Sequence, residues 1–165
     1  MLTQKRLKEL LKYDPETGHF FWLVDRGGIK AGDEAGCKKR AYVFVSVEDK
    51  IYRAHVLAWL YMTGSFPAEF IDHKDLNKQN NSFSNLREAT KGQNMANVGL
   101  IKSNKSGLKG VSRYRAGERY GKPWQASIQV ASKTKHLGHF ETKELAHAAY
   151  CRAAQIHFGE YARAA

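Results

Sequence analysis

The sequence has little cysteine and no long apolar run. Its two cysteines, Cys37 and Cys151, lie far apart, and neither belongs to a Cys-x-x-Cys pair. This argues against a disulfide framework and a cysteine zinc site, and it favours a reducing compartment. No stretch approaches the length of about 18 apolar residues that spans a bilayer, and the first residues lack the apolar core of a secretory signal. We therefore expect a cytoplasmic protein with no membrane segment.

Acidic residues are scarce relative to basic ones. The 165 residues include 27 Lys and Arg but only 16 Asp and Glu, which gives a formal net charge of +11. Most of the excess lies in residues 99–165, with 12 basic and 4 acidic side chains. Such an excess is typical of proteins that bind a polyanion, although a solvated surface or an anionic membrane partner would also explain it.

The first 98 residues have the patterns of a mixed α+β domain. Thr3 can cap a short amphipathic helix, which we expect to end near Pro15 because proline disfavours helix in the residue before it. Aromatic and branched residues predict a strand at 19–24, and alternation predicts a hairpin from 42–47 and 51–53. The glycines between 27 and 36 predict a loop. The next expected elements are a helix at 54–62, a short strand at 69–73, a polar loop at 74–84 and a short helix that carries Gln93, Asn94 and Asn97.

A second domain is expected after residues 99–107, whose glycine, lysine, serine and asparagine content is typical of a linker. We place the domains at 1–98 and 108–165. Strand-like runs at 109–115, 124–131 and 135–140 predict a small three-stranded antiparallel sheet. Thr142 can cap a helix that continues to about Phe158, and its small side chains would let it pack closely on that sheet.

The polar stretch from Asp72 to Asn97 carries the residue types that phosphodiester hydrolysis requires. The reaction needs charge neutralised at phosphorus and a water molecule activated. Asp72 is the expected carboxylate ligand of a divalent metal and Asn94 a neutral amide ligand, which suits Mg²⁺ or Mn²⁺. His73 is the expected general base, because histidine titrates near neutrality. Asn85 could hold the loop backbone that aims the His73 ring.

The spacing of these residues resembles that of HNH endonucleases with the ββα-metal fold, in the branch that includes phage and homing enzymes. Asp-His-x-Asp begins at residue 72, Asn-Leu-Arg at residue 85 and Gln-Asn-x-x-Asn at residue 93. The resemblance implies that Asp72 and Asn94 bind the metal, that His73 is the base and that Asn85 supports the site. It covers residues 72–97 closely. The third letter of the family name is an asparagine here, and the zinc cysteines of other branches are absent.

Three other residues have open roles. Arg87 could contact a phosphate near the scissile bond, or it could form a surface ion pair. His55 lies in Ala-His-Val-Leu-Ala-Trp, which is also typical of this branch, although many relatives have arginine at the position of Val56. It could act at the DNA or the site, or be structural. Asn97 is a possible accessory residue.

Residues 107–165 resemble the plant ethylene-response-factor (apetala-type) DNA-binding domain, which also occurs fused to phage HNH nucleases. Gly-Val at 110, Trp124, Leu-Gly-x-Phe at 137 and Ala-Ala-Tyr-x-x-Ala-Ala at 148 occur in the order of that family. In it, the sheet enters the major groove. By this resemblance the candidate DNA contacts are Lys109, Arg113, Arg115, Lys122, Trp124, Gln129 and Lys135. Ser127 and Gln129 replace the usual glutamate and arginine, so the plant specificity does not transfer. Trp124 could instead pack against its neighbouring strand.

The expected function is therefore metal-dependent hydrolysis of double-stranded DNA, one nick per active site, guided by the C-terminal module. A DNA-binding regulator with a relic HNH fold is the alternative, and an RNA nuclease is another. The sequence indicates no protein partner and leaves the choice between monomer and dimer open.

Overall fold

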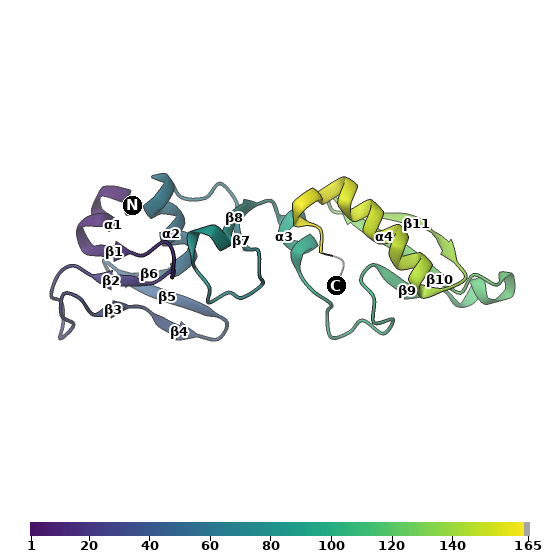
Figure 1. Ribbon diagram of the computed structural model, residues 1–165, viewed down its shortest axis with the longest axis horizontal. Coiled ribbons are helices and arrows are strands. Elements are labelled where there is room, and N and C mark those ends of the chain that lie inside the picture. Colours follow the sequence, from purple (N-terminus) through teal and green to yellow (C-terminus); the bar gives the residue numbers. More distant parts are fainter. Residues whose placement is uncertain (164–165) are drawn as a thin grey trace. The chain divides into compact units, whose positions relative to one another are not determined.

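The computed structural model describes residues 1–163, and its architecture is α+β, as predicted (Figure 1). The chain divides into two compact units, Met1–Ala89 and Thr90–Ala165. Residues 164 and 165, the last two of the predicted second domain, lie outside the described residues. The elements of the first unit are α1 (Gln4–Leu10), β1 (Leu11–Tyr13), β2 (Phe20–Trp22), β3 (Glu34–Ala35), β4 (Cys37–Lys39), β5 (Tyr42–Val47), β6 (Lys50–Arg53), α2 (Ala54–Thr63), β7 (Phe70–His73) and β8 (Leu86–Ala89). Those of the second are α3 (Lys91–Asn97), β9 (Val111–Arg113), β10 (Trp124–Val130), β11 (Lys133–Phe140) and α4 (Lys143–Phe158).

The first unit is built from three small antiparallel sheets and two helices. The sheets have the orders β1-β2-β3, β4-β5-β6 and β7-β8. Leu7 of α1, Val45 of β5 and Leu57 of α2 are at most 1% exposed and belong to one apolar core. This core supports the end of β7, where the predicted catalytic residues begin.

The predicted hairpin and the helix after it are confirmed. β5 pairs with β6 in antiparallel register, with Val45 opposite Tyr52. α2 ends at Thr63, one residue beyond the prediction, and Gly64 follows with a φ of 87°, a left-handed conformation that glycine adopts without steric strain.

Two predictions for the first 40 residues need correction. The first helix ends at Leu10 instead of continuing towards Pro15, because Leu11 and Tyr13 alternate inward and pair with β2. The glycine-rich stretch is also not only a loop, since β3 lies within it and β4 follows directly. Both strands are too short and too exposed to leave an apolar pattern.

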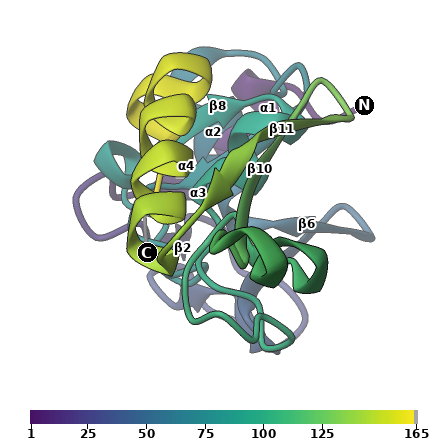
Figure 2. The same ribbon diagram turned by 90° about the vertical axis from the view of Figure 1, so that its right-hand side faces the viewer.

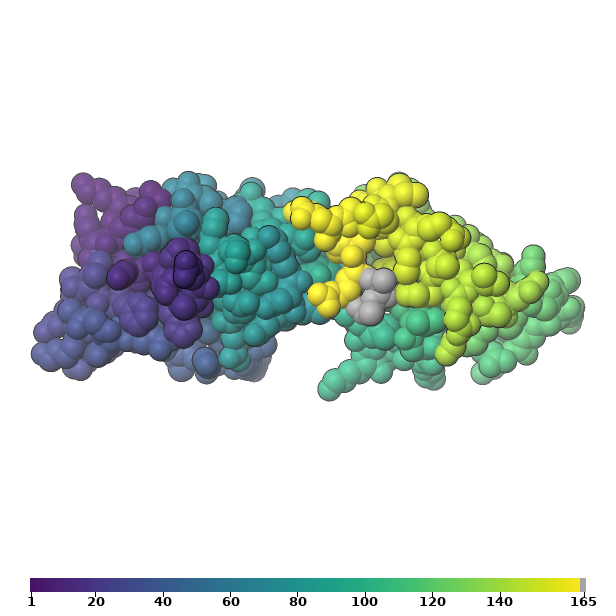
Figure 3. Space-filling model, viewed as in Figure 1, coloured from purple at the N-terminus to yellow at the C-terminus, as the bar shows by residue number. Residues whose placement is uncertain are grey.

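The second unit is a three-stranded antiparallel sheet, in the order β11-β10-β9, with α4 across one face (Figure 2). Thr142 caps α4 as predicted, and its hydroxyl accepts a hydrogen bond from the Leu145 amide. Ala146 and Ala154 of α4 are buried against the sheet, and the outward side of α4 forms much of this unit's surface in the view of Figure 3. Gly110, at φ 72°, allows the backbone to approach the Tyr150 ring, where a Cβ would lie 2.0 Å from a ring carbon.

The division between the units falls before α3, whereas the predicted linker follows it. Lys109 accounts for part of this grouping, because its ammonium donates hydrogen bonds to the carbonyl oxygens of Ala96 and Val98. Arg163 also donates, from Nε to Asn97 Oδ1 at 3.4 Å. The domain limits of 1–98 and 108–165 stay a prediction.

Candidate active site

The predicted base and carboxylate lie at the end of β7. β7 pairs with β8, with Asp72 opposite Arg87 and His73 opposite Leu86. Both Asp72 and His73 are buried, at 3% and 5% exposure. Their side chains are therefore held by packing and partners, which is the condition for a preorganised site.

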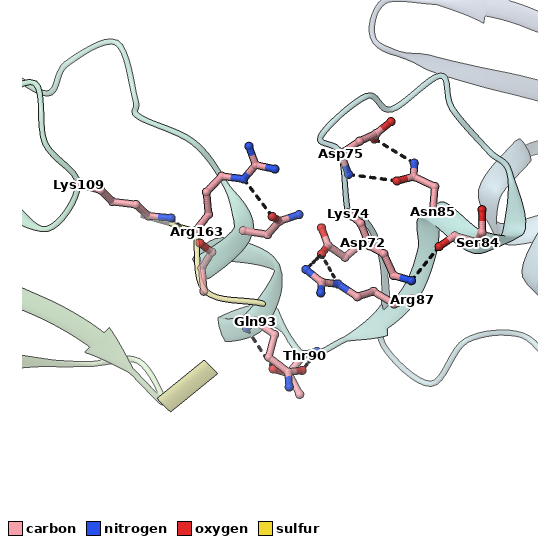
Figure 4. Close-up of polar contacts among 12 residues, drawn as sticks. Asp72, Lys74, Asp75, Ser84, Asn85, Arg87, Thr90, Gln93, Lys109 and Arg163 are labelled. Carbon is pink, nitrogen blue, oxygen red and sulfur yellow. Dashed lines mark hydrogen bonds and ion pairs between the residues drawn. The ribbon is translucent and has the colours of Figure 1, made fainter. Parts of the chain in front are cut away.

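Asn85 braces the polar loop that follows His73 (Figure 4). Its Oδ1 accepts a hydrogen bond from the Asp75 amide at 3.1 Å, and its Nδ2 donates to Asp75 Oδ1 and to the Asn80 carbonyl oxygen, both at 2.9 Å. Lys74 closes the base of the loop, since its amide donates to the Asn85 carbonyl at 3.0 Å. The Asn85 side chain thus links Asp75 and Asn80 within the loop, and its support of the His73 ring stays a prediction.

Asp72 and Arg87 form a buried ion pair (Figure 4). Arg87 Nε and one terminal nitrogen each lie 2.9 Å from Asp72 Oδ2, and the two side chains are 11% and 4% exposed. Arg87 is therefore not the surface ion-pair residue that was one of its two predicted roles. Its charge offsets that of Asp72, which lowers the cost of keeping this carboxylate ionised away from water.

His73 lies between Asn81 and His55. Its Nε2 is 3.3 Å from Asn81 Oδ1, and its ring meets the His55 ring edge to face, with centroids 4.9 Å apart. Burial lowers the pKa of His73, although the Asn81 contact opposes this. A lowered pKa keeps the imidazole neutral at physiological pH, the state in which a general base must begin.

His55 is more strongly buried than expected for a residue that would touch DNA. It lies in the first turn of α2 at 4% exposure, and its Nδ1 has no hydrogen-bond partner within residues 1–163. Burial, followed by the charges of His73 and Arg53, lowers its pKa to about 3. The neutral His55 ring packs between Tyr42, at 5.5 Å between centroids, and His73.

Asn94 and Asn97 belong to α3 in the second unit. α3 begins with a reciprocal capping box, as Thr90 accepts a hydrogen bond from the Gln93 amide and the Gln93 side chain accepts one from the Thr90 amide. This capping box fixes the start of the predicted short helix at Thr90. Asn94 lies near the start of α3, whereas Asn97 is buried at its end.

A basic and aromatic cavity lies on the open face of the β4-β5-β6 sheet. Its volume is about 980 Å³, and its wall includes Trp22, Arg26, Lys39, Tyr42, Phe44 and Arg53. Two of its cations stack on its aromatic rings, Arg26 over Trp22 and Arg53 over Tyr42. Because Tyr42 also packs on His55, this face adjoins the buried histidine pair.

Comparison with known proteins identifies the family to which the chain belongs. The family model described as HNH endonuclease matches residues 52–96. An uncharacterized HNH endonuclease of Acanthamoeba polyphaga mimivirus is 36% identical over 149 residues, which cover 90% of this chain and 68% of the relative. The chain belongs to the HNH endonuclease family. Protein 3.8 of Escherichia phage T7 is 31% identical over 115 residues, or 69% of this chain and 91% of that protein. No solved structure matches the chain.

The donor set of this HNH chain fits a hard divalent cation better than zinc. Within residues 1–163 no three His, Cys, Asp or Glu side chains gather as a metal cluster. The predicted ligands, the Asp72 carboxylate and the Asn94 amide, supply only oxygen. Magnesium and manganese accept such sparse oxygen sets because they keep water and substrate phosphate as further ligands.

The register of the C-terminal sheet sorts the predicted DNA contacts by face. Opposed residues in antiparallel strands project to the same side. Val111 and Ala126 are opposed and buried under α4. Arg113 and Trp124 are also opposed, and each is two positions away from a residue of the first pair in its own strand. Since side chains two positions apart project to the same face, Arg113 and Trp124 also lie on the α4 side. Lys135 also lies there, opposite the buried Ile128. The open face carries Ser112, Gln125, Ser127, Gln129, Thr134, His136 and His139.

The other predicted contacts of this module have separate positions. Arg115 begins a 3₁₀ turn, Arg115–Tyr120, and Lys122 is exposed in the connection to β10. Arg113 pairs with Glu118 at 2.7 Å on the surface. Lys109 is half-buried on the carbonyl groups of α3, and burial lowers its pKa. Among the predicted contacts on the strands, Gln129 is the one that the register places on the open face.

Asn81 is the functional candidate that sequence reasoning missed. It is 2% exposed and contacts His73 directly. Its neighbours in the sequence are also polar, so nothing in the pattern separates it from Asn80.

The helices of residues 1–163 are each too short or too polar to span a bilayer.

Proposed function

We propose that the chain is a metal-dependent DNA endonuclease that nicks one strand per active site. The observation that carries the proposal is the placement of His73, buried beside Asp72 at the end of β7 and at the start of a loop that Asn85 braces. The family match includes these three residues. The homing-type branch and the cytoplasmic location are part of the same proposal, which the viral sources of both relatives support.

The residues divide the reaction between them. His73 accepts a proton from the attacking water, and its low pKa keeps it neutral beforehand. Asp72 and Asn94 would hold Mg²⁺ or Mn²⁺, which supplies positive charge next to the scissile phosphate. Arg87 holds the Asp72 carboxylate in one orientation. Asn85 fixes the loop and so keeps the His73 backbone in place.

DNA would contact both units in this proposal. In the first unit, the basic and aromatic cavity beside His55 supplies cations for phosphates and rings for sugar or base contacts. In the second, the polar open face of the sheet supplies Gln125 and Gln129, whose amides can hydrogen-bond to base edges. The net charge of residues 99–165 supports this targeting role.

Nicking of supercoiled plasmid with Mg²⁺ or Mn²⁺ tests the proposal. We expect conversion to open circles, and we expect His73→Ala to slow it by roughly 10²- to 10⁴-fold, the usual contribution of a general base. His157→Ala, on the exposed surface of α4, is the matched histidine control. No nicking with any divalent metal, or undiminished nicking by His73→Ala, would contradict the catalytic assignment and favour a DNA-binding regulator. Structured RNA as a parallel substrate distinguishes an RNA nuclease.

A further inference from the structure

The contacts of the Asn81 amide fix its orientation. Nδ2 lies 3.1 Å from the Gln79 carbonyl oxygen, and a carbonyl oxygen can only accept a hydrogen bond. The NH₂ end therefore faces Gln79, and the amide oxygen faces His73 Nε2 at 3.3 Å. Because the amide oxygen is also only an acceptor, a hydrogen bond between these two atoms requires the proton of the neutral His73 ring to be on Nε2.

We propose that Asn81 is a positioning residue that selects the Nε2–H tautomer of His73. The lone pair of the ring is then on Nδ1, and Nδ1 is the atom that accepts the proton from water. This last step rests on the proposed nuclease function, whereas the tautomer itself does not. Second-shell groups commonly control histidine in this way, because the hydrogen bond at one ring nitrogen determines the state of the other.

The N-terminal segment holds Asn81 in place. The Tyr13 hydroxyl donates a hydrogen bond of 2.7 Å to the Asn81 carbonyl oxygen, across 68 positions in the sequence. The Phe83 amide donates to the Pro15 carbonyl oxygen at 2.8 Å. Gly18 packs so closely that a Cβ there would lie 2.3 Å from the Asn81 carbonyl carbon. The Asn81 backbone is therefore held by residues far away in the sequence.

His55 restricts the same ring from another direction. Its ring plane is nearly perpendicular to that of His73, at 87°. A ring held by an edge-to-face contact and by a hydrogen bond at Nε2 has little freedom to flip, and a flip would exchange the positions of its two nitrogens. The packing and the hydrogen bond thus favour the same orientation.

The tautomer can be measured directly in the full chain. Long-range ¹H–¹⁵N spectra of protein labelled at histidine distinguish Nδ1–H from Nε2–H, and His73→Gln identifies the signals of His73. At pH 8 we expect the Nε2–H pattern in the wild type, a measurement that needs neither DNA nor metal. An Nδ1–H pattern for His73 would overturn the proposal, whether or not the protein nicks DNA.

Two asparagine variants separate the amide contact from general order in the loop. Asn81→Ala should abolish the single Nε2–H pattern. Asn80→Ala should preserve it, because the Asn80 side chain bonds Asp75 and Ser82 in the same loop but does not contact His73. Equal changes in the two variants, or none in Asn81→Ala, would overturn the assignment.

Kinetics supply the second readout. Asn81→Ala should lower kcat for nicking roughly 10- to 100-fold with KM for DNA unchanged, the usual effect of removing a second-shell partner. A change in KM alone, with kcat unchanged, would mean that Asn81 acts on DNA binding and would overturn the proposal. If the wild type does not nick, the proposed function fails while the tautomer result stands.

Discussion

The buried Asp72–Arg87 ion pair is expected to contribute to the stability of the first unit. Both side chains are almost fully buried, so removal of Arg87 takes away the positive charge that lies 2.9 Å from the buried Asp72 carboxylate. Arg87→Ala should therefore lower the free energy of unfolding by about 3 kcal/mol. Urea unfolding at pH 7 measures this change.

The chain offers a matched control for that substitution. Arg113 pairs with Glu118 at 2.7 Å, but the two side chains are 62% and 50% exposed. Arg113→Ala should cost less than about 1 kcal/mol, as is typical of exposed pairs. Equal losses from Arg87→Ala and Arg113→Ala would show that burial does not govern the Asp72 pair.

The buried His55 predicts a stability that decreases in acid. Its pKa is about 3 in the folded chain and near its ordinary value when unfolded, so between these values the unfolded chain binds a proton that the folded chain excludes. The folded state is then disfavoured progressively as the pH falls below about 6.5, by about 2 kcal/mol at pH 5. The loss is complete below the folded pKa.

Replacement of His55 tests this pH dependence. His55→Leu removes the titrating group, so the difference in unfolding free energy between pH 7 and pH 5 should shrink by about 2 kcal/mol. The remaining slope includes His73, whose lowered pKa acts in the same direction. His157→Leu, an exposed control, should leave the difference as in the wild type. An unchanged slope in His55→Leu would contradict the assignment.

Among elements, those with a one-sided apolar pattern or a capping residue were predictable. α2 and α4 had both a pattern and a marked end, at Gly64 and Thr142 respectively. β3 and β4 could not be predicted, because strands of two and three mostly exposed residues leave no alternation to detect. Leu11 and Tyr13 fit the end of a helix as well as a strand, and only the pairing with β2 decides between them.

The candidate site was predictable where its residues are neighbours in the sequence. Asp72 and His73 are adjacent, and the loop contact of Asn85 follows from spacing across the loop. The role of Asn81 was not predictable, because its support comes from Tyr13 through a long-range contact. The face of the C-terminal sheet on which Arg113 lies could not be predicted either, because residue type does not reveal the register of a strand.

The turn before β2 packs against the loop after His73, so a substitution in this turn is expected to affect the loop. Gly18 combines a φ of 79° with its close approach to the Asn81 backbone. Gly18→Ala should therefore cost more than the conformational strain of about 1 to 2 kcal/mol for alanine at positive φ. It should also increase amide hydrogen exchange in residues 74–85.

Gly28 separates the two effects at Gly18. Its φ of 87° is similar, but nothing lies within 4 Å of a Cβ placed there. Gly28→Ala should thus show the conformational strain alone, with hydrogen exchange in residues 74–85 unchanged. If Gly28→Ala loosened this loop as much as Gly18→Ala, the close contact with Asn81 would not be what holds it.

In the molecule as a whole, the excess of basic side chains and the candidate catalytic residues lie in different segments of the chain. Residues 99–165 carry a net excess of basic side chains, whereas the buried groups that would take part in the reaction lie between 72 and 87. α3 carries Asn94 but belongs to the compact unit that holds the C-terminal sheet.

This distribution predicts where the salt dependence of DNA binding originates. Arg115 and Lys122 are exposed in the second unit, and each phosphate contact contributes about 0.9 to the slope of log K against log salt. Arg115→Ala combined with Lys122→Ala should lower that slope by about 2 in fluorescence anisotropy titrations with duplex DNA. Lys5→Ala combined with Lys12→Ala removes the same charge from exposed positions of the first unit and should leave the slope nearly unchanged. Equal reductions by both pairs would show that net charge, and not phosphate contacts in the C-terminal unit, governs the affinity for DNA.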